Sequence, residues 1–204
     1  MLLTEKRPLK EEISFRGRVF YIDMAFNNIL TVFEIIEDKY LSNAQKLLDT
    51  LYMLTGEDEF SPDYFDSMDK VEYASELQGF IFQEVLGSSN KEEDDYLVDI
   101  LGNKFKPPKS DDEKEERTYD FKHDARYIYS SFLKDYQMDL YDFHDKLHWD
   151  IFLALFEGLS EDTRIKQIMG IRTRELPSGK GTEKEREELL RLKNIYKLPE
   201  REVD

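Results

Sequence analysis

The sequence predicts a mainly α protein, a helical bundle with a short N-terminal β-hairpin. Apolar residues recur at spacings of three and four through most of the chain, and strand-like alternation is confined to residues 12–22. Gly and Pro together supply only 15 of the 204 residues, which is typical of a chain with few loops. A chain of this length can bury a core without metal or disulfide help. The sequence contains no Cys, so disulfides and thiolate sites are excluded.

The hairpin is expected near the N-terminus, where two partly alternating segments flank Arg16-Gly17-Arg18. Gly17 supplies the positive φ that a tight hairpin turn requires. A two-stranded hairpin is only marginally stable in water, so it must pack on the helices or pair with another chain. Its exposed edge is therefore a candidate docking surface.

Three helices are expected between the hairpin and residue 87. The first is capped by Asp23 and carries an apolar stripe from Phe26 to Ile36. The second opens with a capping box, Ser42 to Gln45, and ends at Gly56. The third begins at Ser61-Pro62 and ends before residues 87–90, which read Gly-Ser-Ser-Asn.

The charge distribution divides the chain into three expected regions. Residues 1–90 form an N-terminal hairpin plus an acidic three-helix region, and residues 91–117 an acidic linker containing Pro107-Pro108. The short apolar stretch 96–101 within the linker could dock as a helical turn. Residues 118–204 form a C-terminal helical region.

Four further helical segments are expected in this last region. A helix capped by Thr118 or Asp120 runs to Tyr136. A helix capped by Asp142 carries residues 147–156, which are apolar on nearly every side, so it should be central, with its aromatic residues mostly buried. An amphipathic turn starts at Ser160, and a capping box over residues 182–185 opens the last helix.

The net charge of −16 makes nucleic acid an improbable partner, because an acidic surface repels phosphate. Residues 23–86 carry 14 acidic and 3 basic residues, whereas residues 164–204 carry 8 acidic and 11 basic ones. Solvated helix faces explain the acidity most simply, and the alternative is an acidic region that meets a basic partner or mimics nucleic acid. No apolar run approaches the roughly 20 residues of a membrane span, and no signal-peptide core is visible, so we expect a soluble protein that is not exported.

One pattern resembles a catalytic motif. His144 and His148 are spaced like the zinc ligands of HExxH metalloproteases, but Asp145 stands where the general base is Glu. Because His148 adjoins Trp149 in the most apolar segment, a buried, hydrogen-bonded, neutral histidine is the favoured interpretation. Phosphate loops and nucleophile elbows are missing as well. We therefore expect no enzyme activity, no cofactor and no metal, and elimination favours a binding or scaffolding role.

The C-terminal region resembles the bacteriophage gene-product-fifteen family of siphophages that infect Gram-positive bacteria. The first half agrees more loosely, through the hairpin, the Ser42 box and Gly56. Gln137 stands where the family usually has Gly, and Asp150 where an aromatic residue is common. The resemblance spans about 118–199 and rests on Tyr119-Asp120-Phe121, Asp124-Ala125, Tyr127-Ile128-Tyr129, Phe132, Tyr136, Asp139-Leu140, Leu147-His148-Trp149, Phe152, Leu155, Gly158-Leu159, Thr163, Ile168, Arg172, Pro177, Lys193, Tyr196 and Leu198-Pro199.

The resemblance implies a gene between those of the major tail protein and the tape-measure protein, the position of tail assembly chaperones. Such a chaperone coats the hydrophobic tape-measure protein and keeps it soluble until tail-tube subunits polymerise around it. Its expected partners are the tape-measure protein, a companion tail assembly chaperone, the major tail protein and further copies of itself on the client, with no membrane involved. Its expected location is the host bacterial cytoplasm, with absence from the mature virion.

We expect the client to contact the aromatic surface of residues 119–159 and the region from Arg172 to Tyr196, while residues 23–86 face water. The candidate partner-binding residues are Tyr129, His148, Trp149, Phe152, Arg172, Arg174 and Tyr196. Three alternatives stay open: a structural tail or connector component of the virion, an acidic decoy that binds a host defence factor, and a hydrolase built on His144 and His148.

Overall fold

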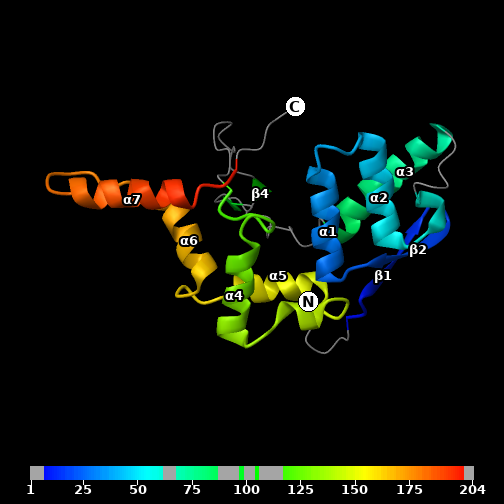
Figure 1. Cartoon of the computed structure of the whole chain (residues 1–204). Helices are drawn as coiled ribbons and strands as arrows, with labels where there is room; N and C mark the ends of the chain where they lie inside the picture. Colours follow the sequence, from blue (N-terminus) through cyan, green and yellow to red (C-terminus); the bar gives the residue numbers. More distant parts are fainter. Residues whose placement is uncertain (1–6, 62–67, 87–96, 99–103, 106–116, 200–204) are drawn as a thin grey trace. The chain divides into compact units, whose positions relative to one another are not determined.

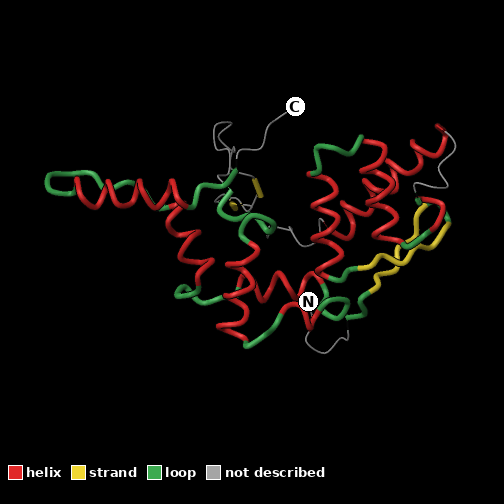
Figure 2. The backbone as a smooth tube through the Cα atoms, viewed as in Figure 1, coloured by secondary structure: helices red, strands yellow, loops and turns green. Residues whose placement is uncertain are grey.

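The computed structural model describes residues 7–61, 68–86, 97–98, 104–105 and 117–199 (Figure 1). These residues form an N-terminal β-hairpin and seven α-helices, which confirms the predicted fold class (Figure 2). The chain divides into two compact units, residues 1–112 with 144–152, and residues 113–143 with 153–204. Most of the predicted linker 91–117 lies outside the described residues. Within it, Leu97–Val98 (β3) and Lys104–Phe105 (β4) pair antiparallel, so a strand pair stands where a helical turn was expected.

The predicted hairpin is confirmed in the first unit. Strands β1 (Lys10–Phe15) and β2 (Arg18–Asp23) pair antiparallel. Arg16 and Gly17 form the two-residue turn with φ values of 49° and 80°, the positive-φ pair that a tight hairpin favours. The alternation of strand side chains buries Phe20 and Ile22 and leaves Val19 and Tyr21 exposed.

Three helices follow the hairpin in this unit: α1 (Phe26–Glu37), α2 (Asn43–Thr55) and α3 (Met68–Ile81), which continues as a π-helical turn at Phe82–Leu86. A 3-10 turn, Asp58–Phe60, separates α2 from α3. The predicted capping box of α2 is formed, because Ser42 and Gln45 exchange both hydrogen bonds. Gly56 ends α2 in the left-handed conformation, as predicted, with φ of 68°.

One helix start in the first unit differs from the prediction. Asp23 belongs to β2, and its carboxylate accepts the N–H of Ala25 at 2.9 Å. Helix α1 consequently begins after Ala25, without a side-chain cap. Helix α3 is described from Met68, and the start predicted at Ser61-Pro62 falls on residues 62–67, which lie outside the described residues.

The segment 144–152 completes the first unit from far along the sequence. The N–H of Trp149 donates to the carbonyl of Met24 at 2.7 Å, and the N–H of Phe26 donates to the carbonyl of Leu147 at 2.9 Å. The Phe152 ring stacks on Phe26 with centroids 4.9 Å apart. Trp149 and Phe152 are both buried, which confirms the prediction made for them.

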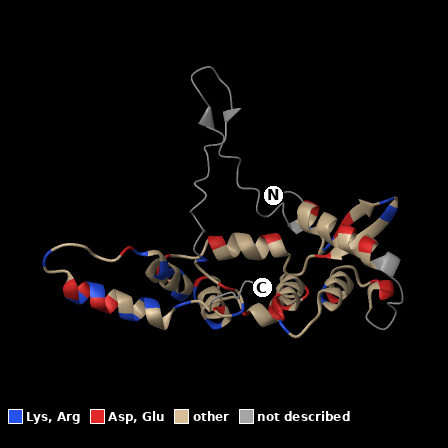
Figure 3. Cartoon of the chain, turned by 90° about the horizontal axis from the view of Figure 1, so that it is seen from above, with Lys and Arg blue, Asp and Glu red and all other residues tan. Residues whose placement is uncertain are grey.

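The second unit is built from α4 (Ala125–Tyr136), a 3-10 turn (Leu140–Phe143), the end of α5 (Trp149–Glu157), α6 (Arg164–Thr173) and α7 (Glu183–Ile195). The first four residues of α5 count with the other unit. The buried apolar side chains that the structure describes in this unit are Ile128, Phe132, Leu140, Phe156, Leu159, Ile165, Ile168 and Leu189. Glu183 and Glu185 lie in the first turn of α7 and Lys193 in its last turn, an arrangement that suits the helix dipole; Figure 3 shows the charges along this helix.

Three predicted caps in the second half are wrong. Asp142 lies inside the 3-10 turn, and α5 begins only at Trp149. The N-cap of α4 is Asp124, while Asp120 accepts the N–H groups of Lys122 and His123 in the preceding turn. The capping box of α7 is not formed, since the Thr182 side chain accepts no backbone N–H of the helix and its hydroxyl donates to the carbonyl of Gly179.

Helix α5 is also less enclosed than predicted. Ala154 and Glu157 are exposed, so one side of the helix faces water. Among the helices that the structure describes, none combines the length and the apolar character needed to cross a membrane.

Candidate functional site

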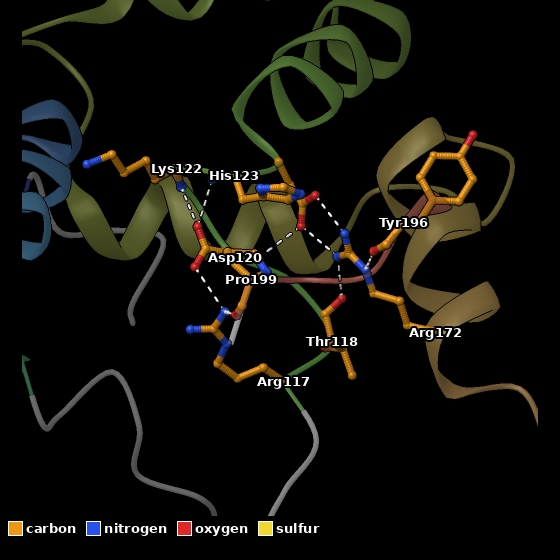
Figure 4. A network of polar contacts seen from close by, with 9 residues as sticks. Arg117, Thr118, Asp120, Lys122, His123, Arg172, Tyr196 and Pro199 are labelled. Atoms are coloured by element: carbon orange, nitrogen blue, oxygen red, sulfur yellow. Dashed lines mark hydrogen bonds and ion pairs between the residues drawn. The ribbon is translucent and has the colours of Figure 1, made fainter. Parts of the chain in front are cut away.

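A buried ion pair organises the second unit (Figure 4). The guanidinium of Arg172, on α6, donates two hydrogen bonds of 2.6 and 2.8 Å to the carboxylate of Asp124. It also donates to the carbonyls of Thr118 at 2.9 Å and Tyr196 at 2.7 Å. The Asp124 side chain is fully buried and that of Arg172 is 8% exposed, so the pair lies in the interior.

This network joins three segments of the unit that are distant in sequence. Asp124 ends the turn before α4, Thr118 precedes that turn, and Tyr196 follows α7. Lys193 of α7 adds a hydrogen bond to the carbonyl of Arg172 at 2.8 Å. Four of the five guanidinium N–H groups of Arg172 are thereby used within the chain. The geometry gives Arg172 a structural role.

The Tyr196 side chain lies at the edge of the same network. Its hydroxyl accepts a hydrogen bond from Arg164, whose guanidinium lies over the ring at 5.3 Å from the centroid. The ring meets Tyr127 edge-on with centroids 6.1 Å apart. Tyr196 is half-buried, whereas Arg174, at the end of α6, is exposed.

His148 lies in a second polar cluster, within the first unit. Its ring is buried, and Nε2 lies 3.2 Å from Oε1 of Glu11 on β1. Nδ1 accepts the N–H of Asp150 at 3.1 Å, so the proton of the neutral ring must be on Nε2, which then donates to Glu11. Burial lowers the pKa of His148, although Glu11 opposes the change. This is the neutral, hydrogen-bonded histidine that the sequence favoured.

The cluster places three potential metal ligands together, because Glu11, His148 and Asp150 each offer one donor atom within 4.8 Å of the others. Two features oppose a metal ion there. Arg7 forms ion pairs with both Glu11 and Asp150, so each carboxylate already has a cationic partner. The Nε2 atom of His148 carries its proton in this hydrogen-bonding pattern and has no lone pair to donate.

The two histidines of the HExxH-like pattern are not on one helix. His144 belongs to a turn after the 3-10 helix, and Asp145 has a positive φ of 56°, which interrupts any helix across the motif. His144 packs edge-on against Phe26 with centroids 5.6 Å apart. The one-turn spacing assumed from sequence is therefore wrong.

An exposed apolar patch lies on the second unit and consists of Tyr129, Leu133 and Tyr141. Tyr129 and Leu133 are four residues apart on α4 and so share a face of the helix. The Tyr141 ring packs against Tyr129 with centroids 5.5 Å apart. Tyr141 is 72% exposed and Leu133 46% exposed, whereas Tyr129 is half-buried. We call these three residues the tyrosine patch.

Local structure explains the position of the tyrosine patch. Gln137 ends α4 in the left-handed conformation, with φ of 51°, and turns the chain back along the helix. Leu140 anchors the following 3-10 turn in the core, and the next residue, Tyr141, is directed outward. The Asp139 side chain fixes this turn by accepting the N–H of Tyr141 at 3.0 Å.

The candidate residues from the sequence thus fall in different environments. His148, Trp149 and Phe152 are buried in the first unit, and Tyr129 belongs to the tyrosine patch of the second. Leu133 and Tyr141 were missed. Leu133 could have been found from its spacing to Tyr129, but the ring contact of Tyr141 depends on the turn at Gln137.

Comparison with protein families matches residues 6–198 to the family described as Bacteriophage Gp15 protein. Comparisons with curated proteins and with solved structures gave no significant match. Because the family match covers nearly the whole sequence, the chain belongs to the bacteriophage Gp15 protein family and is a phage structural or assembly protein.

Proposed function

We propose that this protein is a tail assembly chaperone that binds the phage tape-measure protein and keeps it soluble during assembly of the tail tube. The observation that carries the proposal is family membership over residues 6–198. The family resemblance also implies a gene in the tail module, at the position of tail assembly chaperones. The chaperone acts without catalysis in the host bacterial cytoplasm and is released before the virion is complete. A companion chaperone and the major tail protein are its further partners.

The physical properties of the chain support this role. A long hydrophobic client aggregates unless its apolar surface is covered and its complex carries charge. The net charge of −16 would make each bound copy add repulsion between complexes. The tyrosine patch supplies exposed aromatic surface of the kind that is enriched in protein interfaces.

Co-expression with the tape-measure protein of the same phage tests the proposal. We expect the tape-measure protein to move from the insoluble to the soluble fraction and to co-purify with several copies of the chain. An acidic, helical bacterial protein of similar size is the control for general solubilisation by charge. If the tape-measure protein stays insoluble, or if the control rescues it equally, the proposed function is wrong.

Purified virions test the alternative that the protein is a structural tail or connector component. A chaperone leaves the particle, so mass spectrometry of virions should detect the tail-tube and tape-measure proteins without this chain. Its presence at a fixed stoichiometry in mature particles would favour the structural alternative.

A further inference from the structure

The tyrosine patch is bordered by carboxylates. Asp139 and Asp142 lie in or beside the turn that carries Tyr141, and the Asp139 carboxylate accepts the N–H of Tyr141. Burial raises the pKa of the Tyr129 hydroxyl, and Asp139 and Asp142 both raise it further, which is the expected response to a negative local potential. The border of the patch is therefore acidic on the side of this turn.

The nearest basic residues on α4 are engaged with other groups. The guanidinium of Arg126 lies over the Tyr127 ring, 4.5 Å from its centroid, and donates to the hydroxyl of that residue. The ammonium group of Lys134 bonds to the carboxylate and the carbonyl of Asp162. The face of α4 that carries Tyr129 and Leu133 therefore combines apolar contact with an acidic border.

We propose that the tyrosine patch binds an amphipathic helix of the client in which Lys or Arg residues flank an apolar stripe. The apolar stripe would pack on Leu133 and Tyr141, and the basic residues would face Asp139 and Asp142. Tyr129 and Leu133 are four residues apart on α4, and side chains with this i, i+4 spacing form the ridge on which a second helix packs. The inference rests on the proposed function, since it names the class of client segment for which the patch is suited.

Overlapping synthetic peptides of about 20 residues that tile the tape-measure protein provide the probe, with fluorescence anisotropy on the full chain as the readout. We expect binding to be confined to amphipathic peptides rich in Lys or Arg. The double variant Leu133→Ala/Tyr141→Ala should bind them about tenfold more weakly or worse.

The charge requirement is tested by Asp139→Asn/Asp142→Asn. The amide oxygen introduced at position 139 still accepts the N–H of Tyr141, so the turn is kept while the charge is removed. Wild-type binding should weaken as salt rises from about 50 to about 500 mM, and this variant should bind more weakly with a smaller salt dependence. The matched controls are Tyr40→Ala, at a tyrosine that is 98% exposed in the other unit, and Glu72→Gln, at an exposed acid; both should bind like wild type.

The possible outcomes separate the two proposals. If wild type binds peptides and both double variants bind them equally well, the tyrosine patch is not the site, although the chaperone role stands. If the peptides that bind are uncharged or acidic, the class of client segment is wrong. If wild type self-associates and Leu133→Ala/Tyr141→Ala abolishes this, the patch holds a second copy instead of a client. If neither the peptides nor the co-expressed tape-measure protein bind wild type, the proposed function itself fails.

Discussion

Replacing Arg172 by Met should strongly destabilise the second unit. The substitution removes the charge at similar side-chain length and leaves Asp124, which is fully buried, without its partner. The carbonyls of Thr118 and Tyr196 each lose a hydrogen bond at the same time. Breaking a buried ion pair from one side costs about 3–5 kcal/mol, a large share of the 5–15 kcal/mol by which such proteins are typically stable.

Urea unfolding followed by circular dichroism measures this effect. Helicity is the suitable signal because the single tryptophan, Trp149, belongs to the first unit. A loss of about 3–5 kcal/mol lowers the midpoint by about 1–5 M at the usual urea slope of about 1–3 kcal/mol per M. Lys134→Met is the matched control, because its ion pair with Asp162 is exposed and should contribute less than about 1 kcal/mol.

The double variant Arg172→Met/Asp124→Leu should recover part of the loss, since it leaves no charge buried without a partner. If Arg172→Met instead unfolds within about 1 kcal/mol of wild type, the ion pair does not organise the unit. If it keeps its stability and loses binding of the tape-measure protein, Arg172 is a partner-binding residue, and the structural role derived above is wrong.

Three further predictions concern single positions. Phe152→Ala should lower the free energy of unfolding by about 3–5 kcal/mol, measured by urea denaturation, because the buried ring stacks on Phe26; a loss below about 1 kcal/mol would contradict its place in the core. Gln137→Gly should stabilise the chain by about 0.5–1 kcal/mol in thermal melts, because φ is 51° there; a lower melting temperature would be the contrary result. Burial lowers the pKa of His148 in the fold, so the contribution of its neutral ring to the free energy of unfolding is complete above the unfolded pKa near 6.5 and is lost as pH falls below that value. The melting temperature of wild type should therefore fall more than that of His148→Asn between about pH 7.5 and 5.5, and equal decreases in the two proteins would refute this.

Local features of the fold were predictable because short segments determine them. The positive φ at Gly17, the reciprocal bonds of Ser42 and Gln45, and the stop at Gly56 each depend on a few neighbouring residues. The burial of Trp149 and Phe152 followed from the apolar density around them. The predicted caps Asp23, Asp142 and Thr182 have suitable side chains, but each residue is part of another local structure. Asp23 belongs to β2, Asp142 lies inside a 3-10 turn, and the Thr182 hydroxyl donates to the carbonyl of Gly179.

Long-range pairing was not predictable, since nothing in a short segment specifies it. The bridge between Ala25 and His148 brings residues 144–152 into the first unit, although the sequence places them in the middle of a predicted C-terminal region. Asp124 and Arg172 are 48 residues apart, and the sequence gives no sign that one neutralises the other. Arg172 therefore looked like an available surface cation.

The second unit contains two kinds of residue within the region where the sequence predicts contact with the client. Arg172 forms hydrogen bonds with Asp124 and with the Tyr196 carbonyl, so replacing Arg172 should first lower the free energy of unfolding. Leu133 and Tyr141 are largely exposed, so replacing them by Ala should cost little stability. The exposure of Leu133 and Tyr141 beside two carboxylates is not required by the packing of the unit. Their effect should therefore appear in binding, and a variant that melts like wild type but no longer binds the basic peptides would assign the tyrosine patch to recognition rather than to folding.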